Sequence, residues 1–259
     1  MTSEPFAAFR LDGKVAAIAG GARGIGRATA EAMAAAGAVI AILDRDGAAA
    51  EAAAQALAAA GRRASAHAAD VTDEQGLEAA FAGLVERHGG IDILVNSAGI
   101  GLRHAAVEHP LADWDKVVAV NLTGVFLCSR IAARNMIGRG GGAIVNLASI
   151  MGFSGGGIYP NVSYQATKGA VVNMTRALAV EWANAGIRVN AVAPTWVRTD
   201  LTAALLDQPG VMDRIASLTP MGRLATPEEV ASAILFLASP AAAMVTGHTL
   251  PVDGGFLAQ

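Results

Sequence analysis

The sequence predicts an α/β fold, a doubly wound parallel sheet in a single domain that spans residues 1–259. Short β-branched or apolar runs alternate with longer helical patterns along the chain. Such alternation is typical of βαβ units, in which helices cover both faces of a parallel sheet. No linker, internal repeat or change of composition divides the chain, and its length is common for one α/β domain.

Seven runs have the length and composition of strands, and helical patterns fill the gaps between them. The predicted strands are Val15–Ala19, Val39–Leu43, Ala64–Ala68, Ile91–Asn96, Ala143–Leu147, Arg188–Val192 and Thr249–Val252. The predicted helices are, approximately, Gly24–Ala36, Ala48–Ala60, Glu74–His88, Leu111–Met136, Tyr164–Ala185 and Pro227–Leu237. One stretch, about 194–226, breaks the alternation and contains Pro209-Gly210 and Pro220. Long irregular segments in compact domains are often binding loops, so we expect a substrate-loop insertion there.

Charge and composition argue against several classes of partner. The net charge is −3 and no dense basic run occurs, so neither nucleic acid nor an anionic membrane is expected as a partner. No uninterrupted apolar run reaches the ~18 residues of a membrane-spanning helix, and the start, Met1–Pro5, lacks the pattern of a signal peptide. The single cysteine, Cys128, excludes an intrachain disulfide and a cysteine-cluster metal site. We therefore expect a cytoplasmic protein, and the sequence predicts no metal-ligating residues.

A glycine-rich turn joins the first predicted strand to the first predicted helix. Gly20, Gly24 and Gly26 lie in this turn, with Arg23 and Ile25 among them. Glycines let the backbone approach a pyrophosphate, and the N–H groups and dipole of the helix N-terminus favour an anion. Many turns use glycine, and the spacing G-x-x-x-G-x-G differs from the G-x-G-x-x-G of other dinucleotide folds. The strand–turn–helix context nevertheless predicts a phosphate site.

Asp44 ends the second predicted strand, about 20 residues after the glycines. An acid at this place hydrogen-bonds the adenosine ribose hydroxyls and repels a 2′-phosphate. The alternative is a solvated acid at a strand end. Arg23 and Arg45 could instead pair with a 2′-phosphate. Because Asp44 is placed to reach the sugar directly, we predict that the cofactor is NAD, with NADP as the less favoured alternative.

The ends of the third and fourth predicted strands add candidate cofactor residues. Asp70 and Val71 follow the third strand, where a carboxylate can accept a hydrogen bond from the adenine amino group. Asn96, Ala98 and Gly99 lie at the end of the fourth strand, where small residues would let the backbone run against the cofactor.

Tyr164 and Lys168 are four residues apart at the start of a predicted helix. Positions i and i+4 lie on the same face of a helix. An ammonium beside a phenol stabilises the phenolate and lowers the phenol pKa from about 10 towards working pH. A coincidental surface pair is the alternative, but the chain has only two tyrosines and three lysines. The pair therefore predicts a tyrosine that gives or takes a proton.

Several motifs occur together and in order, namely Gly20–Gly26, Asp70, Asn96–Gly99, Asn121, Ser149, Tyr164-x-x-x-Lys168, Pro194 and Val252–Gly255. With them the chain resembles the short-chain dehydrogenase/reductases over essentially its full length. The resemblance implies a sheet of seven strands and an NAD(P)-dependent oxidoreductase. Within the family, four segments are similar to bacterial polyol and sugar-acid dehydrogenases of the galactitol and gluconate 5-dehydrogenase kind, namely Arg10–Gly13, Asn96–Ile100, Thr219–Arg223 and Leu235–Pro240.

The resemblance also implies a catalytic tetrad of Asn121, Ser149, Tyr164 and Lys168. Ser149 would hydrogen-bond the substrate oxygen, and Tyr164 would donate or accept the proton. Lys168 would lower the Tyr164 pKa and, with Tyr164, contact the cofactor, while the Asn121 amide would hold a water that relays protons. Further cofactor residues would follow the sixth strand, at Pro194, Thr195, Val197 and Thr199. Thr195 replaces the glycine that usually follows this proline.

The substrate pocket should be lined by the loop after Ser149, the turn after Gly99 and the segment after Pro194. Candidates are Met151, Phe153, Tyr159, Trp196 and Leu201, together with Arg103 and His104. His104 could be a second acid or base, but a lone histidine in a loop is ordinarily just solvated. The candidate pocket is mixed, with more apolar than polar groups.

These observations predict an oxidoreductase that transfers a hydride between NAD and a secondary alcohol or ketone, with a polyol or a related hydroxy compound as the small-molecule substrate. One alternative is an NADPH-dependent carbonyl reductase or 3-oxoacyl-carrier reductase, which Asp44 and the net charge of −3 disfavour. Another is a non-catalytic protein on a dinucleotide-binding scaffold, because fold does not fix function. The intact tetrad disfavours that reading.

Two predicted helices, about Leu111–Met136 and Tyr164–Ala185, carry more apolar residues than one face against a sheet needs. These include Val117, Val118, Val120, Val171, Val172 and Trp182. In the family that the chain resembles, the corresponding helices pair across a two-fold axis, and a self-complementary patch fits closed symmetry. We therefore expect a homotetramer. The alternative is that these side chains belong to the core of one subunit.

Overall fold

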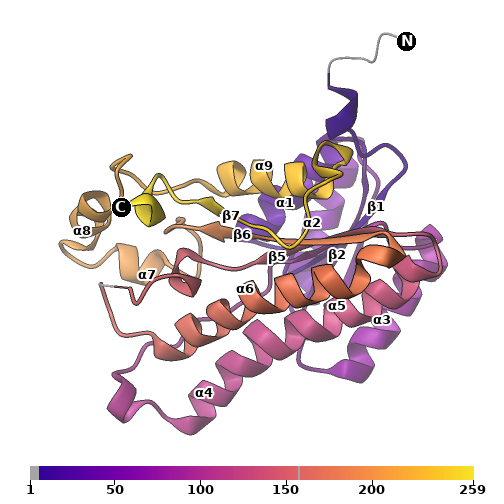
Figure 1. Ribbon diagram of the computed structural model, residues 1–259. Helices are drawn as coiled ribbons and strands as arrows, with labels where there is room; N and C mark the ends of the chain where they lie inside the picture. The colour runs from indigo at the N-terminus through magenta and orange to yellow at the C-terminus, as the bar shows by residue number, and fades with distance from the viewer. Residues whose placement is uncertain (1–5, 157) are drawn as a thin grey trace.

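A computed structural model describes residues 6–156 and 158–259. Residues 1–5, which carry the expectation about a signal peptide, and residue 157 lie outside the described residues. The chain folds into a sheet of seven parallel strands in the order β3-β2-β1-β4-β5-β6-β7, with helices on both faces (Figure 1). The strands are β1 (Val15–Ala19), β2 (Val39–Asp44), β3 (Ala64–Ala68), β4 (Ile93–Asn96), β5 (Gly142–Leu147), β6 (Ile187–Pro194) and β7 (Thr249–Val252). The predicted fold class is confirmed.

The helices form two layers, one on each side of the sheet (Figure 1). One layer contains α1 (Gly24–Ala35), α2 (Gly47–Ala59) and α9 (Pro227–Ala238). The other contains α3 (Glu74–His88), α4 (Leu111–Val118), α5 (Gly124–Ile137) and α6 (Val162–Trp182). Two short helices, α7 (Ala203–Leu206) and α8 (Val211–Leu218), follow β6. The segment predicted as an irregular insertion is therefore partly helical, and an isolated bridge between Val197 and Ala225 closes it at its base.

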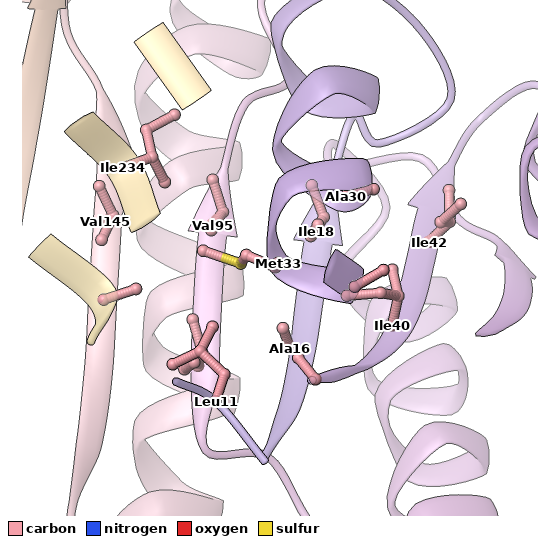
Figure 2. Close-up of a cluster of buried hydrophobic side chains, with 14 of the residues drawn as sticks. Leu11, Ala16, Ile18, Ala30, Met33, Ile40, Ile42, Val95, Val145 and Ile234 are labelled. Carbon is pink, nitrogen blue, oxygen red and sulfur yellow. The ribbon is translucent and has the colours of Figure 1, made fainter. Parts of the chain in front are cut away.

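The hydrophobic core has two halves because alternate residues of each strand point to opposite faces of the sheet. On β1, Ala16 and Ile18 face α1 and α9, whereas Val15, Ala17 and Ala19 face α3 and α5. Figure 2 shows the first half, in which side chains from four neighbouring strands meet residues of the helices above them, including Met33. Complete burial of a Leu, Ile or Met side chain stabilises the fold by roughly 1.5–3 kcal/mol.

The predicted helix Leu111–Met136 is interrupted. A π-helical turn at Ala119–Thr123 separates α4 from α5, and Asn121 lies inside it. The whole helical run, Leu111–Ile137, is long and apolar enough to cross a membrane, with a mean hydropathy of 1.4. Half of its most apolar window is buried within the domain. We interpret it as a core helix, since one half-buried helix of this kind is weak support for a membrane span.

The direction in which successive strands are added to the sheet reverses between β1 and β4, which are parallel neighbours although β2 and β3 lie between them in sequence. In open α/β sheets, ligands bind in the crevice at such a switch point, outside the carboxyl ends of the strands. Gly20 follows β1 and Ala98 follows β4, so the two turns meet there. A Cβ atom on Gly20 would lie 2.6 Å from the Ala98 nitrogen, and the Gly20 φ angle is +75°. Glycine is therefore required at this close approach.

Candidate functional site

The main cavity of the protein has a volume of about 440 Å³ and lies at the carboxyl ends of the strands. It is lined by residues from the turns that follow the strands on both sides of the switch point, together with Tyr164 and Lys168 of α6. All the residues predicted to contact a cofactor line this cavity, except Gly26 and Asn96. The predicted residues that line it are Gly20, Arg23, Gly24, Ile25, Asp44, Asp70, Val71, Ala98, Gly99, Tyr164, Lys168, Pro194, Thr195, Val197 and Thr199.

The N-terminus of α1 opens into the cavity without a side-chain cap. Its N-cap residue, Arg23, makes no capping hydrogen bond, so the first N–H groups of the helix have no side-chain acceptor. Gly24 adopts a φ angle of +52°, and a Cβ atom there would lie 3.2 Å from the Thr199 methyl group. Gly26 lies behind the cavity wall, where any Cβ would collide with the Gly20 carbonyl oxygen. Its role is the close packing of α1 on β1.

Asp44 lies at the end of β2 in the cavity wall and also orders the loop around it. Its Oδ2 atom accepts a hydrogen bond from the Ala22 amide at 3.2 Å, and its Oδ1 atom accepts one from the Asp46 amide at 3.1 Å. Asp46 forms an ion pair with Arg23 at 2.5 Å. The two arginines that could bind a 2′-phosphate therefore differ in their partners. Arg23 is paired with Asp46, whereas Arg45 is exposed at the cavity.

Asp70 begins the turn after β3. Its Oδ1 atom accepts hydrogen bonds from the Thr72 amide at 2.9 Å and the Thr72 hydroxyl at 2.8 Å. The hydrogen bond from the Thr72 amide has the largest effect on the Asp70 pKa and lowers it, while burial partly opposes this lowering. The carboxylate that faces the cavity is thus held in its charged, accepting form.

Asn96 does not line the cavity, contrary to the sequence-based expectation. It is buried, and its Nδ2 atom donates to Ser129 Oγ at 2.9 Å and to Asn146 Oδ1 at 2.8 Å. Asn146 in turn donates to Thr175 Oγ1 at 3.0 Å. This chain of hydrogen bonds ties β4 and β5 to α5 and α6 behind the site. The end of a strand alone does not reveal whether an amide faces the cavity or the helices beneath it.

Tyr164 and Lys168 lie on the same face of α6, as predicted, and the Lys168 nitrogen is 5.5 Å from the centre of the Tyr164 ring. Lys168 is buried, and its Nζ atom donates to the Leu147 carbonyl oxygen at 2.6 Å. Burial lowers the pKa of Lys168 to about 8. Burial also raises the pKa of Tyr164 to about 12, against the lowering effects of a hydrogen bond with Ser149 and the charge of Arg103. Burial is the largest influence on the Tyr164 pKa, and the predicted lowering of that pKa by Lys168 stays a prediction.

Asn121 is fully buried beside these residues, but its side chain is engaged by the backbone. Its Nδ2 atom donates to the Ile100 carbonyl oxygen at 2.8 Å, and its Oδ1 atom accepts from the Ile100 amide at 2.8 Å. The amide therefore positions the segment after β4, and the expectation that it holds a relay water stays a prediction. The π-helical turn supplies this geometry, since it changes the direction of the residue relative to a regular helix.

A second cavity of about 60 Å³ adjoins the first. The two cavities share Ser149, Tyr164, Thr195, Leu201 and Thr202 in their walls. Because Ser149 and Tyr164 carry hydroxyl groups at this junction, a substrate that reaches both would have its reacting carbon there. The second cavity is the natural place for the remainder of a small substrate.

Most of the predicted substrate residues line this second cavity, namely Met151, Tyr159, Trp196 and Leu201. Phe153 does not, because its side chain is 45% exposed and lies outside both cavities. Arg103 lines it, and so does Asn161, which sequence reasoning missed. His104 is not merely solvated, since its Nε2 atom lies 2.8 Å from Asp113 Oδ2, outside both cavities.

The main cavity is also lined by Arg45, which the sequence offers as a phosphate partner, and by Leu201, a predicted substrate residue. The other lining residues carry no chemical signature in the sequence and are Ala69, Ser97, Ile100, Val120, Leu147, Ala148, Asp200 and Thr202. Most are neighbours of predicted residues, so the rule that turns after parallel strands line the ligand crevice could have found them. Across residues 6–156 and 158–259, no group of three or more His, Cys, Asp or Glu residues is arranged to hold a metal ion.

Comparisons with known proteins agree with this geometry. The family model described as enoyl-(acyl carrier protein) reductase matches residues 20–257. The chain is 48% identical over 248 residues to a galactitol 2-dehydrogenase (L-tagatose-forming) of Cereibacter sphaeroides, and the match covers 96% of each protein. It is 39% identical over 247 residues to a 3-oxoacyl-[acyl-carrier-protein] reductase of Aquifex aeolicus, covering 95% of this chain and 98% of that protein.

Among solved structures, a gluconate 5-dehydrogenase from Burkholderia cenocepacia in complex with NADP and tartrate matches with a TM-score of 0.95 and 39% identity. The match covers 99% of this chain and 100% of that one. The fold, the cavity and the relatives thus point to the same chemistry. The chain belongs to the short-chain dehydrogenase/reductase family, and it is an NAD(P)-dependent oxidoreductase that acts on CH–OH groups.

Proposed function

We propose that the protein is an NAD-dependent dehydrogenase that oxidises a secondary alcohol in a polyol or a related hydroxy compound. One observation carries the proposal. Tyr164, Ser149 and Lys168 line a dinucleotide-sized cavity, and Tyr164 and Ser149 also line the small cavity beside it. A substrate carbon at this junction would contact both hydroxyl groups while it faces the larger cavity.

The residues of the main cavity fit a nicotinamide dinucleotide. The uncapped N-terminus of α1 and the close approach at Gly20 form a cradle for a pyrophosphate, which a Cβ atom would fill. Asp44 would hold the adenosine ribose, and Asp70 with Val71 would contact the adenine. Backbone at Ala98 and Gly99 would run along the cofactor. The nicotinamide end would meet Tyr164, Lys168 and the segment from Pro194 to Thr199.

Side chains of the protein would transfer the proton, and a bound nicotinamide would accept the hydride from the substrate. Tyr164 would accept the alcohol proton in the oxidising direction and donate it in the reducing direction. Ser149 would orient the substrate oxygen and stabilise the developing carbonyl. When Lys168 is protonated, its ammonium would favour the phenolate form of Tyr164. Burial opposes this by making the charged form of Lys168 less favourable. Asn121 would position the turn at Ile100.

A preference for NAD rests on Asp44. Its carboxylate lies in the cavity wall and would hydrogen-bond both ribose hydroxyls, whereas a 2′-phosphate would meet a like charge there. Among the described arginines that line the cavity, Arg45 is the one left to favour NADP, since Arg23 is paired with Asp46. The solved relative from Burkholderia cenocepacia contains NADP, so the preference has to be measured for this chain.

The class of substrate is supported by the polar groups of the smaller cavity. Asn161 Oδ1 and Thr195 Oγ1 are buried there without a hydrogen-bond partner among the described residues. Buried polar atoms are normally hydrogen-bonded, so these two are suited to the hydroxyl groups of a ligand. The relative that forms L-tagatose acts on such a polyhydroxylated compound, galactitol.

The competing proposal is a carrier-dependent reductase, in keeping with the description of the matching family model and the relative from Aquifex aeolicus. That reaction would be expected to use NADPH and to need a basic surface for an acidic carrier. Asp44 in the cavity wall disfavours NADPH, and the net charge of −3 disfavours a basic surface for an acidic carrier.

The test is a screen of NAD⁺ reduction, followed by absorbance at 340 nm, over polyols, cyclic alcohols and hydroxy acids, with NADP⁺ in parallel. We expect turnover of at least one polyol or hydroxy acid, and a higher kcat/KM with NAD⁺. Turnover with NADP⁺ only, or efficient reduction of 3-oxoacyl thioesters by NADPH alone, would favour the carrier reductase.

We also propose a homotetramer, although some of the apolar residues predicted to form its interface lie in the core of the subunit. Val117, Val171 and Val172 are buried in the core of the subunit, so the core interpretation applies to them. In the helix layer that contains α5 and α6, Phe126 of α5 and Val180 of α6 remain exposed, Val180 to 81%. Sedimentation velocity at micromolar concentration tests the proposal, and a monomer would contradict it.

A further inference from the structure

Among the described residues, Arg103 is the only charged one in the wall of the small substrate cavity. It lies in the turn after β4, opposite the loop that carries Tyr159, and its guanidinium carbon lies 4.8 Å from the centre of the Tyr159 ring. Its Nε atom is buried and has no hydrogen-bond partner among the described residues. The side chain is therefore held in place by an aromatic face, while a donor of its planar fork is unused.

Other arginines of the chain are either paired or exposed. Arg23, Arg27, Arg130 and Arg223, for example, form ion pairs with carboxylates. Among the described residues, no carboxylate lies within ion-pair distance of Arg103. Six other arginines have no carboxylate or carbonyl partner among the described residues, and all six are solvent-exposed. They are Arg45, Arg62, Arg63, Arg87, Arg176 and Arg214. Arg103 differs from them because it is partly buried.

The cavity therefore presents an uncompensated positive charge to any substrate that enters it. Its wall includes no Asp or Glu, and its other polar groups are the neutral side chains of Ser149, Tyr159, Asn161, Tyr164 and the threonines 195 and 202. The charge of Arg103 is close enough to the catalytic phenol to lower the Tyr164 pKa, although burial raises that pKa more. A partly buried charge without a counter-ion is unfavourable unless a ligand supplies one.

We propose that Arg103 binds a carboxylate of the substrate, so that the preferred substrate is a polyhydroxylated acid of the sugar-acid class rather than a neutral polyol. The inference rests on the proposed function, because it specifies which hydroxy compound occupies the same site. The guanidinium fork fits a carboxylate in a bidentate manner, which no hydroxyl group can match. Asn161 and Thr195 would then meet hydroxyl groups along the carbon chain.

The size of the site limits where the carboxylate can be. The reacting carbon would lie at Ser149 and Tyr164, where the two cavities meet, and the small cavity holds only about 60 Å³ beyond it. This volume accommodates a short polar chain. Arg103 thus selects an acid whose carboxylate is a few carbons from the alcohol that is oxidised.

The matched probes are threonate and threitol, which share a four-carbon polyol chain and differ in one terminal group, a carboxylate or a hydroxymethyl. Binding of each to the enzyme–NADH complex is measured by calorimetry, and kcat/KM for NAD⁺ reduction is measured with each. Wild type is expected to prefer threonate in both assays. Arg103→Met should lower the threonate-to-threitol ratio at least ~10-fold, because a hydrogen-bonded charge pair is lost.

Two further variants separate charge from structure. Arg103→Lys keeps a point charge and should retain part of the preference for the acid. Arg176→Met removes an exposed arginine on α6 and should leave the ratio at the wild-type value. Thermal melts and NADH binding check that each variant is folded, since Arg103 does not line the main cavity.

The binding assay decides the inference without turnover. An unchanged threonate-to-threitol affinity ratio in Arg103→Met, or wild-type binding that favours threitol, would overturn the role of Arg103 even if both alcohols are oxidised. Failure of the proposed function has a different signature, namely threonate binding that depends on Arg103 together with no NAD⁺ reduction by any hydroxy compound in the screen.

Discussion

Asn121 and Ile100 are joined by a reciprocal pair of hydrogen bonds, each 2.8 Å long, between one side-chain amide and one backbone residue. The pair connects the π-helical turn between α4 and α5 to the segment after β4. Gly99, next to Ile100, lines the cofactor cavity, and a Cβ atom there would lie 3.8 Å from the Lys168 nitrogen. Asn121 therefore fixes backbone that lies beside Lys168.

Replacement of Asn121 by Asp keeps an acceptor for the Ile100 amide but places a carboxylate oxygen against the Ile100 carbonyl. We expect the free energy of unfolding to fall by about 1–3 kcal/mol and kcat to fall with it, because the turn beside Lys168 shifts. Urea denaturation and steady-state kinetics measure the two effects. Asn184→Asp, at an exposed asparagine, is the matched control. Wild-type stability and kcat in Asn121→Asp would refute the positioning role.

The cofactor preference is tested at Asp44 and Arg45. Asp44→Ala should weaken NAD⁺ binding at least ~10-fold, because the carboxylate loses charged hydrogen bonds to the ribose. It should strengthen NADP⁺ binding, because Arg45 remains exposed at the cavity while Arg23 stays paired with Asp46.

The gain in NADP⁺ affinity should disappear in Asp44→Ala/Arg45→Ala and persist in Asp44→Ala/Arg62→Ala, where the second arginine is exposed away from the cavity. Asp44 also accepts a hydrogen bond from the Ala22 amide, so Asp44→Asn, which keeps an acceptor, checks for disorder of the glycine loop. A wild-type enzyme with a lower Kd for NADP⁺ than for NAD⁺ would contradict this account.

The sequence was sufficient for the sheet, its order of elements and most of the cofactor cavity, because these follow from local periodicity and from the rule that ligands bind where turns leave parallel strands. The pairing of Tyr164 with Lys168 could be predicted because helical spacing is local. What could not be predicted depends on three-dimensional surroundings. No local pattern indicates that Asn96 points behind the cavity, that Asn121 bonds Ile100, or that Phe153 points outwards. The raised pKa of Tyr164 arises mainly from burial, which depends on how the rest of the chain packs around the phenol.

Lys168 gives a stability signature that depends on pH. Burial lowers its pKa from 10.5 to about 8, so between these values the unfolded chain binds a proton that the folded protein has released. The free energy of unfolding of wild type should therefore rise with pH across this window, relative to Lys168→Met, by up to about 3 kcal/mol.

Urea denaturation of both proteins from pH 7 to pH 10.5 measures this difference. Lys116→Met removes an exposed ammonium on α4 and controls for the loss of a charge. Parallel stability curves for wild type and Lys168→Met would show that Lys168 is not desolvated in the folded protein.

Tyr164→Phe tests the central claim, since it removes only the hydroxyl group that would carry the proton. The informative measurement is kcat for NAD⁺ reduction by wild type and Tyr164→Phe, with a hydroxy compound found in the screen, alongside NADH binding by fluorescence. General acid–base catalysis contributes about 10²–10⁴-fold, so kcat should fall by at least ~10² while the Kd for NADH stays close to that of wild type. A Tyr164→Phe enzyme that binds NADH and retains a third of the wild-type kcat would contradict the assignment of Tyr164 as the catalytic acid and base.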